Sequence, residues 1–129
     1  MKTVLINATV VGLGGFLGAI GRYGLSGLIH RQIPHTAFPY GTIAVNLLGC
    51  LGIGVVAGLA ESRQMFDAEL RTFVLIGILG GFTTFSTFGN ETFQMIRDEQ
   101  YLRATTNVGV QVILGLMLVW IGYAITASR

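Results

Sequence analysis

The sequence has few charges, two prolines and one cysteine, and each shortage excludes a class of protein. Only 11% of the 129 residues are charged, whereas 52% are hydrophobic, a balance that a soluble domain of this length would not carry. Because Cys50 is the single cysteine, an intrachain disulfide is excluded, and we expect this side chain to serve packing. The composition indicates that a lipid bilayer surrounds the chain.

Four apolar stretches are long enough to cross a bilayer as helices, which takes about 20 mostly apolar residues each. They cover residues 4–21, 41–60, about 73–93 and about 104–127. The connections between them (26–40, 61–72 and 95–103) are short, so we expect no extramembrane domain. We interpret the first stretch as a retained helix and not as a signal peptide, because three more apolar stretches follow it. The predicted fold class is an all-α integral membrane protein, with residues 1–129 forming one four-span unit.

Positive charges are divided equally between the two sides that four spans create. One side has Lys2, Arg63, Arg71 and Arg129, and the other has Arg22, Arg31, Arg97 and Arg103. Since an excess of positive residues normally marks the cytoplasmic side, this balance predicts no preferred orientation; chance balance and dual insertion both explain it. Four thin helices do not easily enclose a pathway, so we expect an antiparallel pair of chains.

Glycines recur at spacings that allow helices to approach closely. Gly14, Gly18 and Gly21 share one face of the first span, and Gly54 and Gly58 share a face of the second. Small residues at such spacings let helices pack backbone to backbone in membranes. This pattern agrees with the expected association of subunits.

Polar side chains at membrane depth form two helical faces. Thr42, Asn46 and Gly49 lie on one face of the second span, and Asn107, Gln111 and Gly115 lie on one face of the fourth. Each face has two explanations, an interhelical hydrogen bond or a hydrophilic track, and Asn107 has a third, a position near the membrane surface. Arg22 at the end of the first apolar stretch either anchors the helix end or attracts anions to a pore mouth.

The third span contains the strongest signal, the run Gly80-Gly81-Phe82-Thr83-Thr84-Phe85-Ser86-Thr87-Phe88. Paired glycines and hydroxyls that bond carbonyls favour a break in the helix. Unwound backbone at membrane depth is tolerated only beside protein or a water-filled cavity, and broken helices of this kind mark ion and substrate sites. The run predicts a functional centre in this span.

The chemistry of the run suits a small ion. It has no carboxylate before Glu91 and no lysine or histidine, so freed carbonyls would suit a bare cation and hydroxyl or amide hydrogens a small anion. The edges of phenyl rings are electropositive, so Phe85 and Phe88, three residues apart, could also present hydrogens to an anion, although lipid or helix packing is the more usual explanation of such residues. The residues leave the sign of the ion open.

This run resembles the Fluc fluoride-channel family, also called CrcB, and the resemblance covers nearly the whole chain. It includes Gly14-Gly15-Phe16-Leu17-Gly18-Ala19 with Arg22-Tyr23, Gly41-Thr42 with Val45-Asn46 and Gly49, and the third-span run. The resemblance implies a channel and not an enzyme, with passive export of fluoride through two pores of a dual-topology antiparallel homodimer. It further implies a multi-pass protein of the bacterial inner membrane, with fluoride, a second copy and lipid as partners and no nucleic acid.

The resemblance also implies roles for individual residues. Phe85, Phe88, Asn46, Ser86 and Thr87 are similar to pore residues of the family, and Asn107 and Gln111 continue the polar track where other members often carry tyrosine and serine. Arg22 and Glu91 resemble residues of the aqueous vestibule. Gly80 and Thr83 resemble positions whose main-chain carbonyls, from both subunits, hold a structural sodium ion.

Two other functions compete with this interpretation. A small multidrug-resistance exporter also has four short spans, but its proton exchange needs a carboxylate embedded in the first span. Asn7 and Thr9 are the only polar side chains of that stretch before Arg22. A purely structural membrane subunit would explain the glycines but not a donor-rich break beside a polar helix face.

Overall fold

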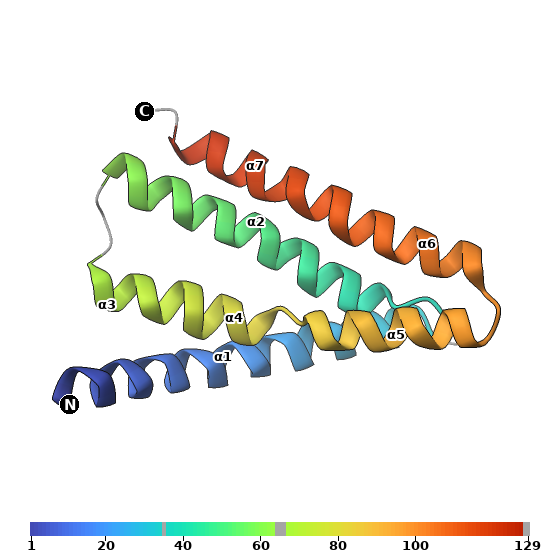
Figure 1. Ribbon diagram of the computed structural model, residues 1–129, viewed down its shortest axis with the longest axis horizontal. Coiled ribbons are helices and arrows are strands. Elements are labelled where there is room, and N and C mark those ends of the chain that lie inside the picture. The colour runs from blue at the N-terminus through green and yellow to red at the C-terminus, as the bar shows by residue number, and fades with distance from the viewer. Residues whose placement is uncertain (35, 64–66, 128–129) are drawn as a thin grey trace.

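The computed structural model describes residues 1–34, 36–63 and 67–127, in which four helical rods lie side by side (Figure 1). Each rod is long and apolar enough to cross a membrane, and the described residues contain no β-strand. The first two rods are α1 (Lys2–Gln32) and α2 (Tyr40–Arg63). The third consists of α3 (Ala68–Arg71), η1 (Thr72–Leu79), α4 (Gly80–Phe82) and α5 (Phe85–Arg97). The fourth consists of α6 (Tyr101–Gly109), η2 (Val110–Leu114) and α7 (Gly115–Ala127).

The arrangement confirms the predicted all-α four-span fold class. The N-terminus, the end of α2, the start of α3 and the end of α7 lie at one end of the bundle, as four alternating spans require (Figure 1). Large apolar side chains of several rods face outward, among them Leu5, Ile76 and Trp120. Arg129 of the predicted charge balance, and residues 64–66 of the predicted second connection, lie outside the described residues.

The first rod is longer than we predicted from the sequence. We placed residues 26–40 in a connection, but α1 continues to Gln32, and the backbone N–H of Ile33 still bonds the Ile29 carbonyl at 3.0 Å. Charged and polar residues end an apolar stretch without ending a helix, because their tips reach water while their stems pack. The helix ends just before Pro34, at the residue that proline disfavours in a helix.

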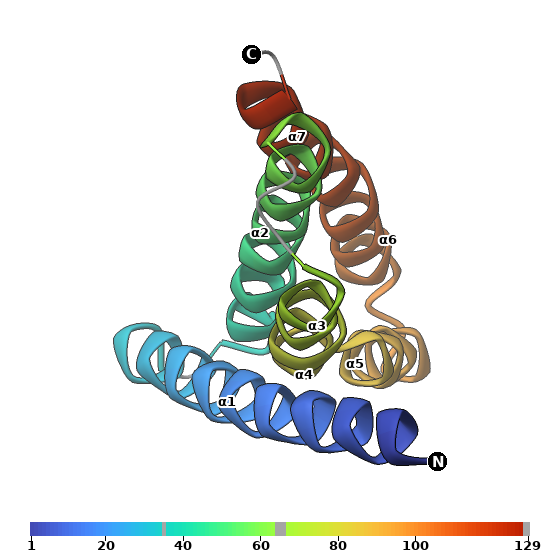
Figure 2. The same cartoon turned by 90° about the vertical axis from the view of Figure 1, so that its left-hand side faces the viewer.

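The rods pack in pairs through glycines. α1 contacts η1 and α4, and α2 contacts α7 (Figure 2). A Cβ atom added at Gly14 would lie 2.7 Å from the Phe73 carbonyl oxygen, and one added at Gly58 would lie 2.7 Å from the Tyr123 carbonyl oxygen. The predicted close approach of glycine faces is therefore confirmed. These contacts lie within one chain, so packing of the bundle accounts for the spacing at Gly14 and Gly58, and the association of subunits stays a prediction.

Candidate functional site

The third rod is interrupted at two residues. α4 ends at Phe82 and α5 begins at Phe85, while Thr83 (φ −78°, ψ 159°) and Thr84 (φ −148°, ψ 113°) are extended. Thr84 is buried, with 8% of its surface exposed, and its hydroxyl oxygen accepts the Thr87 N–H at the start of α5. The interruption therefore has its own cap, and the new helix end points its free N–H groups at the break.

The interruption releases main-chain carbonyls of the preceding turn from helical hydrogen bonds, among them those of Gly80 and Thr83. In a continuous helix the Thr84 N–H would bond the Gly80 carbonyl and the Thr87 N–H would bond the Thr83 carbonyl. Here the Thr84 N–H donates to Asn46 Oδ1 at 2.8 Å, and the Thr87 N–H donates to Thr84 Oγ1 at 3.3 Å. The carbonyls of Gly80 and Thr83 are thus available to another partner.

Asn46 of α2 holds the extended residue from both sides. Its Oδ1 accepts the Thr84 N–H, and its Nδ2 donates to the Thr84 carbonyl at 3.1 Å. The same Nδ2 donates to Gln111 Oε1 of η2 at 2.6 Å. Both amide hydrogens of Asn46 therefore have partners within the chain, and the side chain positions the break.

A series of side-chain hydrogen bonds continues from Asn46 through the fourth rod and back to the third. Gln111 Nε2 donates to Asn107 Oδ1 at 2.8 Å, and Asn107 Nδ2 donates to Thr92 Oγ1 at 2.9 Å. Thr92 Oγ1 donates in turn to the Phe88 carbonyl at 2.8 Å. We call Asn46, Gln111, Asn107 and Thr92 the amide chain. It links the interruption and α5 to the second and fourth rods.

Burial decides between the explanations that the sequence left open for the fourth span. Asn107 is fully buried (0% exposed), and its amide donates to Thr92 of the third rod, so an interhelical hydrogen bond and not solvent satisfies it. Gln111 is half-buried and lies in η2, a π-helical stretch, and a second such stretch, η1, directly precedes α4. Since π-helical turns occur often at functional sites, η1 before the break and η2 in the fourth rod support a functional role of the break.

Six of the predicted site residues line one groove of about 330 Å³: Asn46, Gly80, Thr83, Phe85, Phe88 and Gln111. The Phe85 and Phe88 rings both line the groove, with their centroids 5.5 Å apart and their planes at 48° to each other. Phe85 is 83% exposed. Such exposure is unusual for a side chain that lines a site, and it leaves the groove open on this side. The groove combines two phenyl rings, residues with freed carbonyls and the half-buried amides of Asn46 and Gln111.

Thr87 and Arg22 lie apart from this groove, in a hollow of about 580 Å³ between α1, α2 and the start of α5. Thr84 Oγ1 donates to Thr87 Oγ1 at 2.9 Å and lies 3.5 Å from Ser86 Oγ. Ser86 is exposed, as is Thr87. The hydroxyls therefore form a short polar ridge on the side of the break that faces Arg22's hollow.

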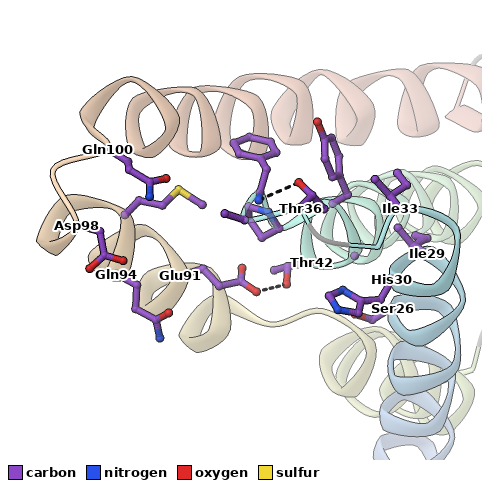
Figure 3. Close-up of a pocket in the computed structure, with 16 residues that line it drawn as sticks. Ser26, Ile29, His30, Ile33, Thr36, Thr42, Glu91, Gln94, Asp98 and Gln100 are labelled. Atoms are coloured by element: carbon purple, nitrogen blue, oxygen red, sulfur yellow. Dashed lines mark hydrogen bonds between the residues drawn. The ribbon is translucent and has the colours of Figure 1, made fainter.

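Glu91 lines a third cavity, of about 330 Å³, between the end of α1, the segment before α2, and α5 (Figure 3). Its Oε1 accepts a hydrogen bond from Thr42 Oγ1 at 2.7 Å. Its Oε2 is buried and, among the described residues, has no hydrogen-bond partner. The structure places this carboxylate close to the predicted polar face of α2 and not in the groove with the phenylalanines.

Four contributors were missing from the residues that we predicted to form the site: Thr84 as the cap, Thr92 as the end of the amide chain, and Ser26 and His30 of α1. Ser26 and His30 follow Arg22 at intervals of four, a helical spacing that would have identified them if the first helix had been extended to Pro34. No local pattern pairs Thr92 with Asn107.

A metal at this site would have to be held by main-chain oxygens. Within the described residues there is no group of three or more His, Cys, Asp or Glu side chains that would hold a metal ion. The freed carbonyls of Gly80 and Thr83 are oxygen ligands of the kind that alkali cations accept.

Known proteins are similar to this chain over most of its length. Residues 9–123 match the family described as CrcB-like protein, Camphor Resistance (CrcB). A fluoride-specific ion channel FluC of Nitratidesulfovibrio vulgaris is 45% identical over 113 residues, which cover 88% of this chain and 90% of that protein. The fluoride-specific ion channel FluC of Geotalea daltonii is 41% identical over 124 residues, 96% of each chain. The archaeon Methanosarcina acetivorans has a similar protein, fluoride-specific ion channel FluC 1, at 37% identity over 122 residues.

Proposed function

The chain belongs to the CrcB-like protein family, and from this membership and the geometry of the break we propose that it is a membrane channel that conducts fluoride. The relatives are named fluoride-specific ion channels, so the chain is a transport protein and not an enzyme. The single observation that carries the proposal is the interrupted third span, at which neutral donors and ring edges line one groove.

Neutral donors suit this ion. Fluoride is small and holds its water tightly, so a selective path must replace that water with closely spaced donors and still release the ion. Phe85 and Phe88 provide ring edges, and Ser86 and Thr87 provide hydroxyls. No lysine or arginine lines the described groove, and a fixed charge there would hold the ion too long. Passive movement down the electrochemical gradient follows from this arrangement.

Asn46 and Asn107 have supporting parts in the proposed path. Asn46 uses both amide hydrogens on Thr84 and Gln111, and Asn107 is fully buried. We propose that they hold the break and orient Gln111, whose Nε2 has one hydrogen bonded to Asn107 and a second to offer to an ion.

The proposal includes an antiparallel homodimer with a path on each side. The balanced charges allow both orientations, and the exposed Phe85 ring leaves the groove open on one side. A second, inverted copy would close that groove with the same surface of its own, as a two-fold interface requires. Each groove would then become an enclosed pore.

The proposal also includes a structural sodium ion between the subunits. Gly80 is exposed, and its carbonyl and that of Thr83 lack their helical N–H partners because these bond Asn46 and Thr84. Two such carbonyls from each subunit would offer four oxygens to one cation. The ion would join the subunits and compensate the partial negative charge of the freed oxygens.

Fluoride efflux from proteoliposomes, followed with a fluoride electrode, tests the channel. We expect the wild type to release fluoride and retain chloride, and Phe88→Ile to reduce fluoride release at least tenfold. Phe16→Ile makes the same change at an exposed position of α1 and should conduct like the wild type. Equal chloride release by the wild type would refute the proposed selectivity.

Two further experiments test the assembly. In a Cys50→Ser background, a cysteine at exposed Glu99 should react from both sides of intact cells, whereas labelling from one side alone contradicts dual insertion. Replacement of sodium by N-methylglucamine in every buffer should lower fluoride efflux and weaken the dimer in detergent. Unchanged efflux and dimer content would count against the sodium site.

A further inference from the structure

Two cavities meet at three residues of this protein. The hollow of about 580 Å³ that contains Arg22 and the cavity of about 330 Å³ that contains Glu91 share Ser26, His30 and Thr42 in their walls. Arg22, Ser26 and His30 follow one another at intervals of four on α1, so their side chains line one face of that helix. His30 is exposed and stands beside Ser26 and Thr42 at the edge of the Glu91 cavity (Figure 3).

The hollow is suited to an anion. Its walls contain the Arg22 guanidinium and the hydroxyls of Thr84 and Thr87. Thr84 caps α5, a helix of 13 residues, and the partial positive charge at the start of a helix also favours anions. The phenol of Tyr23 and the imidazole of His30 are the other titratable groups in this wall.

The adjoining cavity carries the opposite charge. Glu91 of α5 and Asp98, the residue that follows α5, lie in its wall, and Tyr40 lies at its α2 side. Glu91 is half-buried and its hydrogen bond to Thr42 places its carboxylate beside the shared residues. Of the described residues that line this cavity, His30 alone is basic. Asp98 pairs with the Arg97 guanidinium at 3.1 Å, so an anion that crosses this cavity is repelled mainly by the Glu91 carboxylate, and a positive charge on the His30 ring would attract it.

We propose that His30 is a further residue of the fluoride path, which attracts the anion to the inner hollow when its ring is charged. The inference rests on the proposed channel function and adds a property to it, a flux that depends on pH. A histidine ring ordinarily changes charge between pH 5 and 8. Fluoride flux should therefore rise as the pH falls through this range.

The expected size of the effect follows from Coulomb's law. A unit charge about 8 Å from an ion in a water-filled cavity changes the local ion concentration about twofold, and low-dielectric walls increase this to about fivefold. We expect the initial rate of fluoride efflux at pH 5.5 to exceed that at pH 7.5 by about two- to fivefold at low salt. At about 1 M salt the ratio should fall toward one, because screening shortens the reach of the charge.

The experiment compares efflux at equal internal and external pH from liposomes that hold the wild type, His30→Gln or His30→Lys. Protein-free liposomes give the leak of hydrogen fluoride at each pH. His30→Gln should conduct at the lower, high-pH rate throughout, and His30→Lys at the higher rate throughout. If His30 had only a structural role, the neutral and the charged replacement would not differ in their efflux rates in this way.

Arg31→Gln is the matched control, because Arg31 is exposed and, among the described residues, is not in either wall. It should keep the pH dependence of the wild type. A wild-type flux that is flat with pH after leak correction, or a His30→Gln variant that keeps the slope, overturns the role of His30. Absence of wild-type fluoride flux at every pH overturns the channel proposal instead, so the two failures are distinct.

Discussion

Replacement of Asn46 by leucine tests how the interruption is held. Leucine matches asparagine in branching but has no polar atom, so the variant loses the bonds to the Thr84 N–H, the Thr84 carbonyl and Gln111 Oε1. Thr84 is 8% exposed, which leaves its main-chain groups without water to replace the lost partner. We expect the extended residues to lose their register, and the fluoride path to lose its shape.

The three lost hydrogen bonds set the magnitude. At the membrane average of about 0.6 kcal/mol each, they sum to about 2 kcal/mol. Leaving the buried N–H and carbonyl of Thr84 unpaired costs about 1–3 kcal/mol each, so the variant should lose between about 2 and 6 kcal/mol of stability. If about 2 kcal/mol falls on the conducting conformation, the flux drops about 30-fold.

Initial fluoride efflux and the melting temperature in detergent measure the two consequences. Asn7→Leu provides the control, since Asn7 is exposed on α1 and its replacement should change neither quantity. The double variant Asn46→Leu/Gln111→Leu should lose less stability than the two single variants together, by at least about 0.5 kcal/mol, because it leaves no orphaned Gln111 oxygen. Wild-type flux in Asn46→Leu, or strict additivity in the double variant, would refute the positioning role.

Three other substitutions test the packing and the network. Gly54→Val should prevent α2 from packing on α7, because an added Cβ overlaps the main chain of the fourth span. Size-exclusion chromatography should show aggregation of this variant. Gly109→Val has open space around its Cβ and should elute normally. Thr92→Val removes the hydroxyl that ends the amide chain and should lower stability by about 1 kcal/mol and flux several-fold. Thr105→Val makes the same change at an exposed position and should keep the melting temperature within about a degree of the wild type. Tyr123→Phe removes an exposed hydrogen bond of 2.6 Å to the Glu61 carboxylate. The melting temperature and the flux should stay close to the wild-type values, and a large change in either would contradict the surface position of this bond.

The membrane environment, the number of spans and the position of the interruption could be predicted from the sequence alone. Lipid leaves main-chain groups no partner except one another, so apolar stretches of this length have to be helices. The run from Gly80 to Phe88 combines glycines with hydroxyls that bond main-chain groups, and such a break is a local property of the backbone. The interruption at Thr83 and Thr84 lies inside that run.

The tertiary structure decided which polar groups meet. Asn46 and Thr84 are 38 residues apart and Asn46 and Gln111 are 65 apart, and their pairing depends on the rotation and register of helices that share no local pattern. The same holds for the fully buried Asn107, which the sequence left with three explanations. The length of α1 belongs here too, since its continuation to Gln32 brings His30 beside a carboxylate of another span. Helical periodicity assigns each residue a face, but only the packed bundle decides what lies opposite that face.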